Sequence, residues 1–319
     1  WEHTNILHVT MAEEEFAQQN NLPLEEFVNI TSRSREKLLL ERSKRVRPLT
    51  DDKIILGWNA MLNTAYSKVF AATGIEKYRT LAVKNMEFLL EKFEGKNGFF
   101  HTYKDGVAKF PAFLDDYVQL INALIHLQEI TSDGSWLEKV KTLVKWCIAH
   151  FGEDETGYFY FTNDQQEDVI VRKKELYDGA VPSGNSLMAW NLYYSGIVFD
   201  NAEWRERAVK MCAGLKDMTL KYPGSFGIWA ILVQALSKGV PEIAVTGGGL
   251  DGILKELLRI FIPYRVVQSS PLESKGFPLL EGKSYLDSPL IWLCKDYACQ
   301  APVNEVSALQ KMTDGMLKN

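Results

Sequence analysis

Residues 114–151 read LDDYVQLINALIHLQEITSDGSWLEKVKTLVKWCIAHF, and this stretch decides the fold. Its first half, 117–127, is apolar on nearly every face, which is typical of a helix packed on all sides. A short turn, Ser132-Asp133-Gly134, follows it. The second half, 136–151, carries a single apolar stripe at helical spacing, which indicates one buried face and one exposed face. The stretch therefore predicts a hairpin made of an inner helix and an outer helix.

Two further stretches have the same organisation, one from Gly57 through Gly106 and one from Ser183 through Met218. The outer helix of each unit opens on an aromatic residue, namely Tyr78, Trp136 or Trp204. β-like segments follow the first two units at 98–100 and 157–161, and a fourth inner helix is expected at 226–236. A repeat of about 60 residues indicates a solenoid or a closed ring of hairpins. We expect a mainly α fold, an (α/α) hairpin toroid similar to an (α/α)6 barrel but incomplete in this chain.

The pattern changes after Lys238. Residues 242–246 and 264–268 are predicted strands, and 250–262 is a predicted helix between them. We therefore expect residues 1–240 to form the helical hairpins. Residues 241–319 would form a small βαβ appendage and a C-terminal tail on the same domain.

Between the first strand and the helix of the appendage, Gly247 to Gly252 matches the G-x-G-x-x-G pattern of dinucleotide-binding proteins. The acidic residue that would follow, Glu273, lies beyond Pro271 rather than at a strand end. A single βαβ unit is also too little sheet for that fold. A Gly-rich turn is favoured over a nucleotide site, and no cofactor is expected.

Composition excludes several classes of protein. The chain has 319 residues and a net charge of −5, so no basic excess supports nucleic-acid binding. No apolar run is long enough to span a membrane. Four cysteines in a chain of this length favour a reducing, cytoplasmic compartment over a disulfide scaffold. The chain begins at Trp1 without a Met, which we interpret as a fragment or a processed form.

Polar residues recur at the starts of the inner helices. Counting back 19 positions from each outer-helix aromatic reaches Asn59, Tyr117 and Asn185. Helix capping explains single residues of this kind. Capping does not require adjacent acids, a Trp and repeated amides, so for the whole set we favour a small-molecule pocket.

The first functional hypothesis is a carbohydrate-active enzyme or a sugar-binding barrel. Paired carboxylates in unlike environments would act as general acid and base. The candidate catalytic residues are Asp115, Asp116, Glu175 and Asp178. The candidate substrate-binding residues are Trp58, Asn59, Tyr117, Lys174, Tyr177, Ser183 and Asn185. No metal site is expected, because no histidine belongs to a recognisable metal-binding pair.

Two cysteines near the C-terminus, Cys294 and Cys299, have C-x4-C spacing. This is neither the C-x-x-C of redox motifs nor half of a zinc site. Packing of small side chains and a redox or metal role all remain open for this pair. Cys147 and Cys212 lie on apolar stripes and are expected in the core.

Five segments, in this order along the chain, resemble the C-terminal part of the YyaL and spermatogenesis-associated protein 20 family. They are 47–53 (RPLTDDK), Trp58-Asn59, 113–117 (FLDDY), 177–186 (YDGAVPSGNS) and 294–302. The resemblance implies an (α/α)6 barrel similar to those of N-acylglucosamine 2-epimerases and six-hairpin glycosidases. It also implies an N-terminal thioredoxin-like domain that is absent from this chain.

The resemblance motivates a second hypothesis, a non-catalytic helical module that partners a thioredoxin-like redox domain. Cys294 and Cys299 would then be the substrate dithiol of that domain. The epimerases use histidines as acid and base, and no histidine is found at the predicted inner-helix starts. The sequence therefore does not by itself support epimerisation.

Overall fold

The computed structural model describes residues 8–318 and divides at Asp52 into two compact units. The first unit contains α1 (Glu13–Gln19) and α2 (Leu24–Ser43), and the rings of Phe16 and Phe27 stack between them. The first predicted domain began at residue 1 and the second ended at residue 319, and residues 1–7 and 319 lie outside the described residues. The predicted domain boundary near residue 240 stays a prediction. Among the described helices, none has the length and apolar character to cross a bilayer.

The second unit is built from inner and outer helices, as predicted. The inner helix α5 is buried along most of its length, whereas the outer helix α6 buries one stripe that includes Val140, Val144 and Cys147. The mainly α fold of helical hairpins is therefore confirmed. Its helices are α3 (Leu56–Thr73), α4 (Glu76–Phe93), α5 (Leu114–Thr131), α6 (Ser135–Phe151), α7 (Gly184–Val198), α8 (Ala202–Ala213), α9 (Lys216–Lys221), the short 3-10 helix η1 (Pro223–Ser225) and α10 (Gly227–Lys238).

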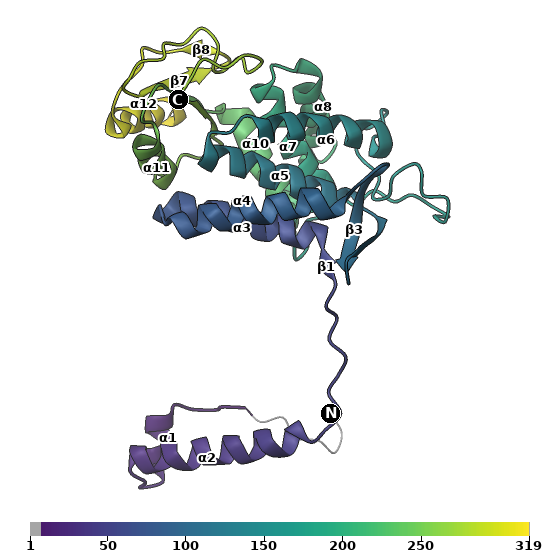
Figure 1. Ribbon diagram of the computed structural model, residues 1–319, viewed down its shortest axis with the longest axis vertical. Helices are drawn as coiled ribbons and strands as arrows, with labels where there is room; N and C mark the ends of the chain where they lie inside the picture. The colour runs from purple at the N-terminus through teal and green to yellow at the C-terminus, as the bar shows by residue number, and fades with distance from the viewer. Residues whose placement is uncertain (1–7, 319) are drawn as a thin grey trace. The chain divides into compact units, whose positions relative to one another are not determined.

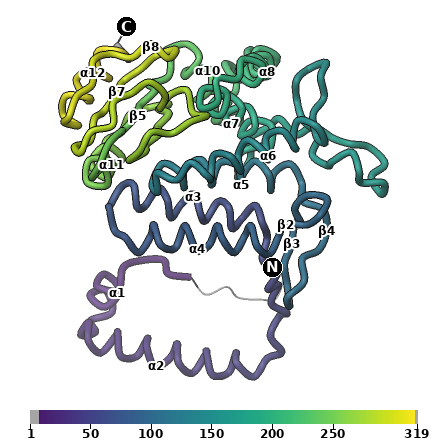
Figure 2. The backbone as a smooth tube through the Cα atoms, turned by 45° about the horizontal axis from the view of Figure 1, so that its top comes forward, coloured from purple at the N-terminus to yellow at the C-terminus, as the bar shows by residue number. Residues whose placement is uncertain are grey.

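The inner helices α3, α5, α7 and α10 lie side by side in chain order, each packed on the next (Figure 1). Within residues 53–318, no extensive contact joins α3 to α10. The described inner helices thus form an open arc rather than a closed ring. Their N-terminal ends lie together, because Asp116 at the start of α5 binds the amide of Gly57 in α3, and Asp178 binds the amides of Ser183 before α7 and Ile228 in α10. Figure 2 shows the backbone of the same helices in a second view.

A small antiparallel sheet is formed by strands on either side of the first hairpin in the sequence. It consists of β1 (Ile54–Ile55), β2 (Glu94–Gly95), β3 (Gly98–Lys104) and β4 (Val107–Pro111), with β3 at its centre. The predicted counterpart at 157–161 is not a strand and keeps only an isolated bridge between Gly152 and Phe159. The side chain of Asn185 accepts a hydrogen bond from the amide of Phe159 and donates one to its carbonyl. An asparagine side chain therefore replaces the partner strand.

The predicted βαβ appendage is confirmed and is larger than expected. Its elements are β5 (Glu242–Thr246), α11 (Asp251–Arg259), β6 (Val266–Ser270), β7 (Leu290–Lys295), β8 (Ala298–Cys299) and α12 (Val306–Lys318). Strands β5 and β6 are parallel, and β7 pairs antiparallel with the other edge of β5. The strand order is β6-β5-β7-β8.

The appendage binds the C-terminal ends of the inner helices. Arg259 donates to the carbonyl of Thr73 at the end of α3 (2.8 Å), and the Tyr297 hydroxyl donates to the carbonyl of Ile197 in α7 (2.5 Å). These carbonyls belong to the last turns of helices, which lack partners within the helix. The appendage therefore covers one end of the arc, and the starts of the inner helices lie at the opposite end.

The Gly-rich turn of the appendage is already occupied by the chain itself. The amide of Gly247 donates to the carbonyl of Ser270, and the amide of Gly248 donates to that of Leu286. A Cβ added to Gly247 would lie 2.7 Å from the Leu286 oxygen. A phosphate cradle needs free amides and open space. The turn is therefore a close chain crossing, which argues against the nucleotide interpretation.

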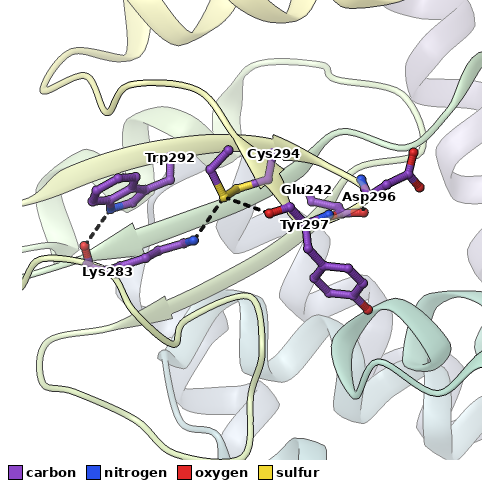
Figure 3. Close-up of a disulfide and its surroundings, with 8 residues drawn as sticks. Glu242, Lys283, Trp292, Cys294, Asp296 and Tyr297 are labelled. Atoms are coloured by element: carbon purple, nitrogen blue, oxygen red, sulfur yellow. Dashed lines mark hydrogen bonds between the residues drawn. A yellow bond between two sulfur atoms is a disulfide. The ribbon is translucent and has the colours of Figure 1, made fainter.

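Cys294 and Cys299 form a disulfide across the β7–β8 hairpin (Figure 3). The two turn residues, Asp296 and Tyr297, both have positive φ, as a two-residue type I′ hairpin requires. Their amides donate to the carboxylate of Glu242. Cys294 is buried, whereas Cys299 is exposed. The spacing of five residues is thus explained by a tight hairpin with facing cysteines.

This pairing predicts the thiol count. Protein purified without reductant and unfolded in guanidinium should show two thiols, Cys147 and Cys212, and four after reduction. A Cys299→Ser variant should show three thiols without reduction, because Cys294 is released. Titration with a chromogenic disulfide reagent measures each value. Four thiols in the unreduced wild type would contradict the pairing.

Candidate functional site

A cavity of about 120 Å³ lies at the starts of α3 and α5, and we call it the inner chamber. Its walls come from α3, β3, α5 and the segment before α7. Three of the sequence-predicted site residues, Trp58, Asp115 and Asp116, line it together with His101. Val181 and Pro182 complete one wall. The chamber thus lies where the helix starts were expected to converge.

Asp116 is the most heavily bonded side chain of the chamber. Its Oδ1 accepts the amide of Gly57 (2.9 Å), while its Oδ2 accepts the amide of Phe113 (2.9 Å) and lies 2.8 Å from His101 Nδ1. The residue is 2% exposed. One carboxylate therefore joins the start of α3, the start of α5 and strand β3.

Two glycines let the neighbouring helices approach α5 this closely. A Cβ on Gly57 would lie 3.0 Å from Asp116 Oδ1, and a Cβ on Gly184 would lie 2.4 Å from Asp115 Oδ1. Side chains at these positions would push the helix starts apart. The adjacent acids of α5 are thus held between Gly57 on one side and Gly184 on the other.

Asp115 is in a different state from its neighbour. Its Oδ1 is buried and, among the described residues, has no hydrogen-bond partner. Burial raises the pKa of Asp115 to about 6, and the charges of Glu175 and Asp116 add to this effect. A backbone hydrogen bond from Gly184 lowers the pKa and opposes this shift. Asp115 is therefore a carboxyl group that loses its proton near pH 6 rather than near pH 4.

His101 completes the site and was missed by the sequence analysis, which found no histidine at the inner-helix starts. That expectation is corrected, because the β3–β4 hairpin returns the chain from His101 to the start of α5. The hydrogen bond to Asp116 raises the pKa of His101, although burial opposes this. With a carboxylate at Nδ1, the proton of the neutral ring sits on Nδ1 and leaves Nε2 as the basic atom.

Two residues predicted to contact ligand lie in the core instead. Tyr117 is 2% exposed, its hydroxyl accepts the amide of Phe99, and its ring packs on Phe99 and Phe151. The amide group of Asn185 is fully used by the backbone of Phe159 and the carbonyl of Glu175. Both residues share one repeat position, and each binds the backbone of the segment that follows the preceding hairpin, at Phe99 or at Phe159. Neither lines the chamber.

The starts of α7 and α10 are bound by side chains of the segment before α7, which includes Tyr177, Asp178 and Ser183. Asp178 accepts the amides of Ser183 (2.9 Å) and Ile228 (3.0 Å), and Ser183 caps α7 by accepting the amide of Ser186. The hydroxyl of Tyr177 accepts from Ser225. These contacts assign the three residues a structural role, and their predicted roles in chemistry or binding have no direct support.

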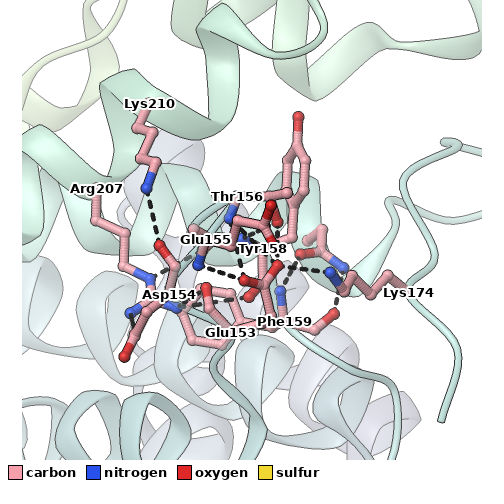
Figure 4. A network of polar contacts seen from close by, with 11 residues as sticks. Glu153, Asp154, Glu155, Thr156, Tyr158, Phe159, Lys174, Arg207 and Lys210 are labelled. Atoms are coloured by element: carbon pink, nitrogen blue, oxygen red, sulfur yellow. Dashed lines mark hydrogen bonds and ion pairs between the residues drawn. The ribbon is translucent and has the colours of Figure 1, made fainter.

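The remaining predicted residues, Lys174, Asn59 and Glu175, do not line the chamber. Lys174 Nζ lies 2.6 Å from Glu153 Oε2, within the polar network around the 153–159 turn (Figure 4). The Asn59 side chain donates to the carbonyl of Ile55. Glu175 is exposed and acts on the site through its charge, since it raises the pKa of Asp115.

Comparison with curated proteins agrees with the motifs. The chain is 24% identical to mouse spermatogenesis-associated protein 20 over 332 residues and 23% identical to the human protein over 329 residues. An uncharacterized Caenorhabditis elegans protein is 26% identical over 325 residues. The chain resembles spermatogenesis-associated protein 20 over nearly its whole length. Each match covers 97% of this chain but only 42–44% of the relative, so the chain spans less than half of these proteins.

No protein-family model matches the chain. Similar solved structures include a D-mannose isomerase (TM-score 0.41, 15% identity, 50% of this chain and 41% of that one). The cellobiose 2-epimerase of Spirochaeta thermophila has a TM-score of 0.45 at 12% identity, over 56% of this chain and 47% of that one. A family 105 glycoside hydrolase of C. acetobutylicum has a TM-score of 0.41 at 15% identity, over 64% and 61%.

The three hydrogen bonds of Asp116 predict a stability effect. Asp116→Asn leaves one acceptor oxygen and turns an NH2 group toward N–H donors, so it should lower the free energy of unfolding by about 1–3 kcal/mol. Glu138→Gln, at an exposed first-turn acid of α6, is the matched control and should change it by less than about 0.5 kcal/mol. Urea unfolding followed by circular dichroism measures both. An Asp116→Asn variant as stable as the control would contradict the bonding described.

Asp115→Asn should act in the opposite direction. The pKa of Asp115 is raised in the folded state from 3.8 to about 6, so the folded protein binds more protons between these values and loses stability as the pH rises through them. At pH 7.5 the neutral amide avoids this loss and should stabilise the fold by about 1–2 kcal/mol, allowing for partial exposure. At pH 4 the two proteins should be nearly equal. A variant less stable than wild type at pH 7.5 would contradict the raised pKa.

Proposed function

We propose that the inner chamber binds a sugar-like small molecule and that the chain moves protons on it, as isomerases and epimerases do. The observation that carries this proposal is the pair of unlike groups in one chamber. Asp115 has a raised pKa and an unpartnered oxygen, and His101 is oriented by Asp116. A carboxyl group that keeps its proton up to about pH 6 and an imidazole with a basic nitrogen are suited to serve as acid and base.

The roles follow from the geometry. His101 accepts a proton at Nε2 from the carbon next to the ligand carbonyl, while Asp115 donates its proton to the carbonyl oxygen. The resulting enediol becomes the isomeric sugar when His101 delivers the proton to the former carbonyl carbon and the neighbouring hydroxyl gives its proton to Asp115. Return of the proton to the original carbon instead regenerates the starting sugar, and neither route consumes a further reactant. Asp116 is a positioning residue, because it fixes the tautomer and orientation of His101.

Other walls of the chamber suit a carbohydrate. Trp58 is 67% exposed at the chamber, and an aromatic face of this kind packs against the C–H face of a sugar ring. The carboxyl group of Asp115, which lines the chamber, is a hydrogen-bond acceptor suited to a sugar hydroxyl. Within residues 8–318, no cluster of three His, Cys, Asp or Glu side chains is placed to hold a metal ion, so the proposal assigns the acid–base steps to side chains.

The proposal predicts hydrogen exchange at the carbon next to the carbonyl. Wild-type protein incubated with D-mannose or D-glucose in D2O should replace the C2 proton by deuterium, seen as loss of the C2 signal in proton NMR. His101→Gln and Asp115→Asn should each slow the exchange by at least about 100-fold. Because the acid must be protonated and the base neutral, the rate should peak between the two pKa values and fall on both sides.

The matched control is His126→Gln. His126 also pairs with a carboxylate, Glu129, at 3.1 Å, but it lies outside the chamber. This variant should keep the wild-type exchange rate. The proposal is wrong if neither sugar exchanges, or if His101→Gln and Asp115→Asn exchange as fast as His126→Gln.

One observation favours a second candidate function, thiol–disulfide exchange with a thioredoxin-like partner. The sulfur of Cys299 is exposed, and Lys283 Nζ lies 3.2 Å from it, where an ammonium group would stabilise a thiolate. A partner thiolate would attack Cys299 and release Cys294, and the second partner thiol would then release Cys299. The partner dithiol is oxidised and the pair is reduced. We propose a reducing, cytoplasmic compartment, in which such exchange proceeds.

A further inference from the structure

A second and larger cavity adjoins the inner chamber. It encloses about 670 Å³, and we call it the outer chamber. The two cavities share three wall residues, Ile55, His101 and Phe113. His101, the proposed base, therefore borders both spaces.

The sizes of the two chambers differ in a way that bears on the ligand. Pockets that bury a whole small-molecule ligand enclose about 300–1,000 Å³. The inner chamber, at about 120 Å³, lies below this range, and the outer chamber, at about 670 Å³, lies within it. The space at Asp115 suits the reacting end of a molecule, and the rest of a larger ligand has room only in the outer chamber.

The outer chamber has its own unfilled hydrogen-bond acceptor. Gln165, Gln166, Glu167 and Asp168 line it. Over the described part of the chain, Gln166 Oε1 is buried and has no hydrogen-bond partner. Buried oxygens of this kind are costly unless something donates to them. Each chamber is therefore lined by one residue that has a buried acceptor oxygen without a partner, Asp115 in the inner chamber and Gln166 in the outer one.

The loop that carries these side chains is held at its base. Arg172 donates to the carbonyls of Thr162 (2.6 Å) and His150 (2.9 Å), and its guanidinium lies 4.2 Å from the centre of the Tyr160 ring. The amide of Phe161 donates to the carbonyl of Lys173 (2.7 Å). The two ends of the 162–173 segment are thus tied together. These contacts fix the base of the loop whose residues 165–168 line the outer chamber.

An aromatic residue lines the same chamber. Phe110, in β4, is 63% exposed and lines the outer chamber. Its φ is +63°, a backbone conformation that bulky residues rarely adopt. Such strain persists where the surroundings enforce it, and it clusters at ligand sites. An exposed ring together with amide and carboxylate groups matches a sugar unit, which has an apolar face and a polar edge.

We propose that the ligand is a sugar chain of at least two units, which occupies both chambers. The reacting unit lies against Asp115 and His101, and the second unit lies in the outer chamber against Phe110 and Gln166. This inference rests on the proposed function and adds to it the length of the substrate. It makes Phe110 and Gln166 specificity residues that act on the second unit only.

The test compares sugars of one and two units. Calorimetric titration of the wild type uses D-glucose, D-mannose, cellobiose and β-1,4-mannobiose. At least one disaccharide should bind about tenfold more tightly than its own monosaccharide. Gln166→Ala and Phe110→Ala should each remove about fivefold of this gain and leave the monosaccharide affinity within about twofold, because they touch only the second unit.

Lys173→Ala is the matched control, since Lys173 is an exposed residue of the same loop and lines neither chamber. It should behave as the wild type. Equal affinity for monosaccharides and disaccharides overturns the inference, as does an equal loss for both in the Gln166 and Phe110 variants. Monosaccharide exchange without any preference for two units would overturn this inference alone. Absence of binding by all four sugars would overturn the proposed function as well.

Discussion

The site depends on one buried carboxylate. Asp116 accepts the amide of Gly57 at the start of α3, the amide of Phe113 at the start of α5, and the ring N–H of His101 on β3. Three separate elements meet at this group, and the partners satisfy donors that would otherwise be buried without acceptors. Asp116 lines the inner chamber and fixes the orientation of the His101 ring. The neighbouring Asp115 has a buried Oδ1 without a hydrogen-bond partner among the described residues.

The C-terminal and N-terminal ends of the inner helices differ in how their polar groups are bonded. At the C-terminal ends the appendage supplies Arg259 and Tyr297, which donate to carbonyls of the last helical turns. At the N-terminal ends the chain leaves space, and burial without a partner raises the pKa of Asp115. The first arrangement stabilises the fold, because helix ends are satisfied. The arrangement at the N-terminal ends keeps Asp115 in surroundings that destabilise its charged form. Ionisable groups with shifted pKa values are typical of ligand-binding and catalytic sites.

Much of this could be predicted from the sequence. The apolar periodicity indicated the inner and outer helices, and the polar clusters indicated which end carries the site. The roles within the clusters could not be separated, because Asp115 and Asp116 are neighbours of the same type, and only their partners distinguish them. Asn185 and Tyr117 share a repeat position but serve the backbone. His101 lies on a strand outside the helical repeat, and its approach to Asp116 depends on the β3–β4 turn. Cys294 and Cys299 are likewise cross-strand neighbours because of a two-residue turn, and their spacing matches no known motif.

The chemistry of the site depends on Asp115 keeping its proton up to about pH 6 beside a histidine bound to Asp116. Retention of this proton is tested most directly by a pH titration of the Asp115 side-chain carboxyl carbon, observed by 13C NMR and assigned with the Asp115→Asn variant. The structure predicts a midpoint near 6. Glu175→Gln should lower that midpoint, because the charge of Glu175 contributes to it. A midpoint near the ordinary value of 3.8, unchanged by Glu175→Gln, would contradict the account.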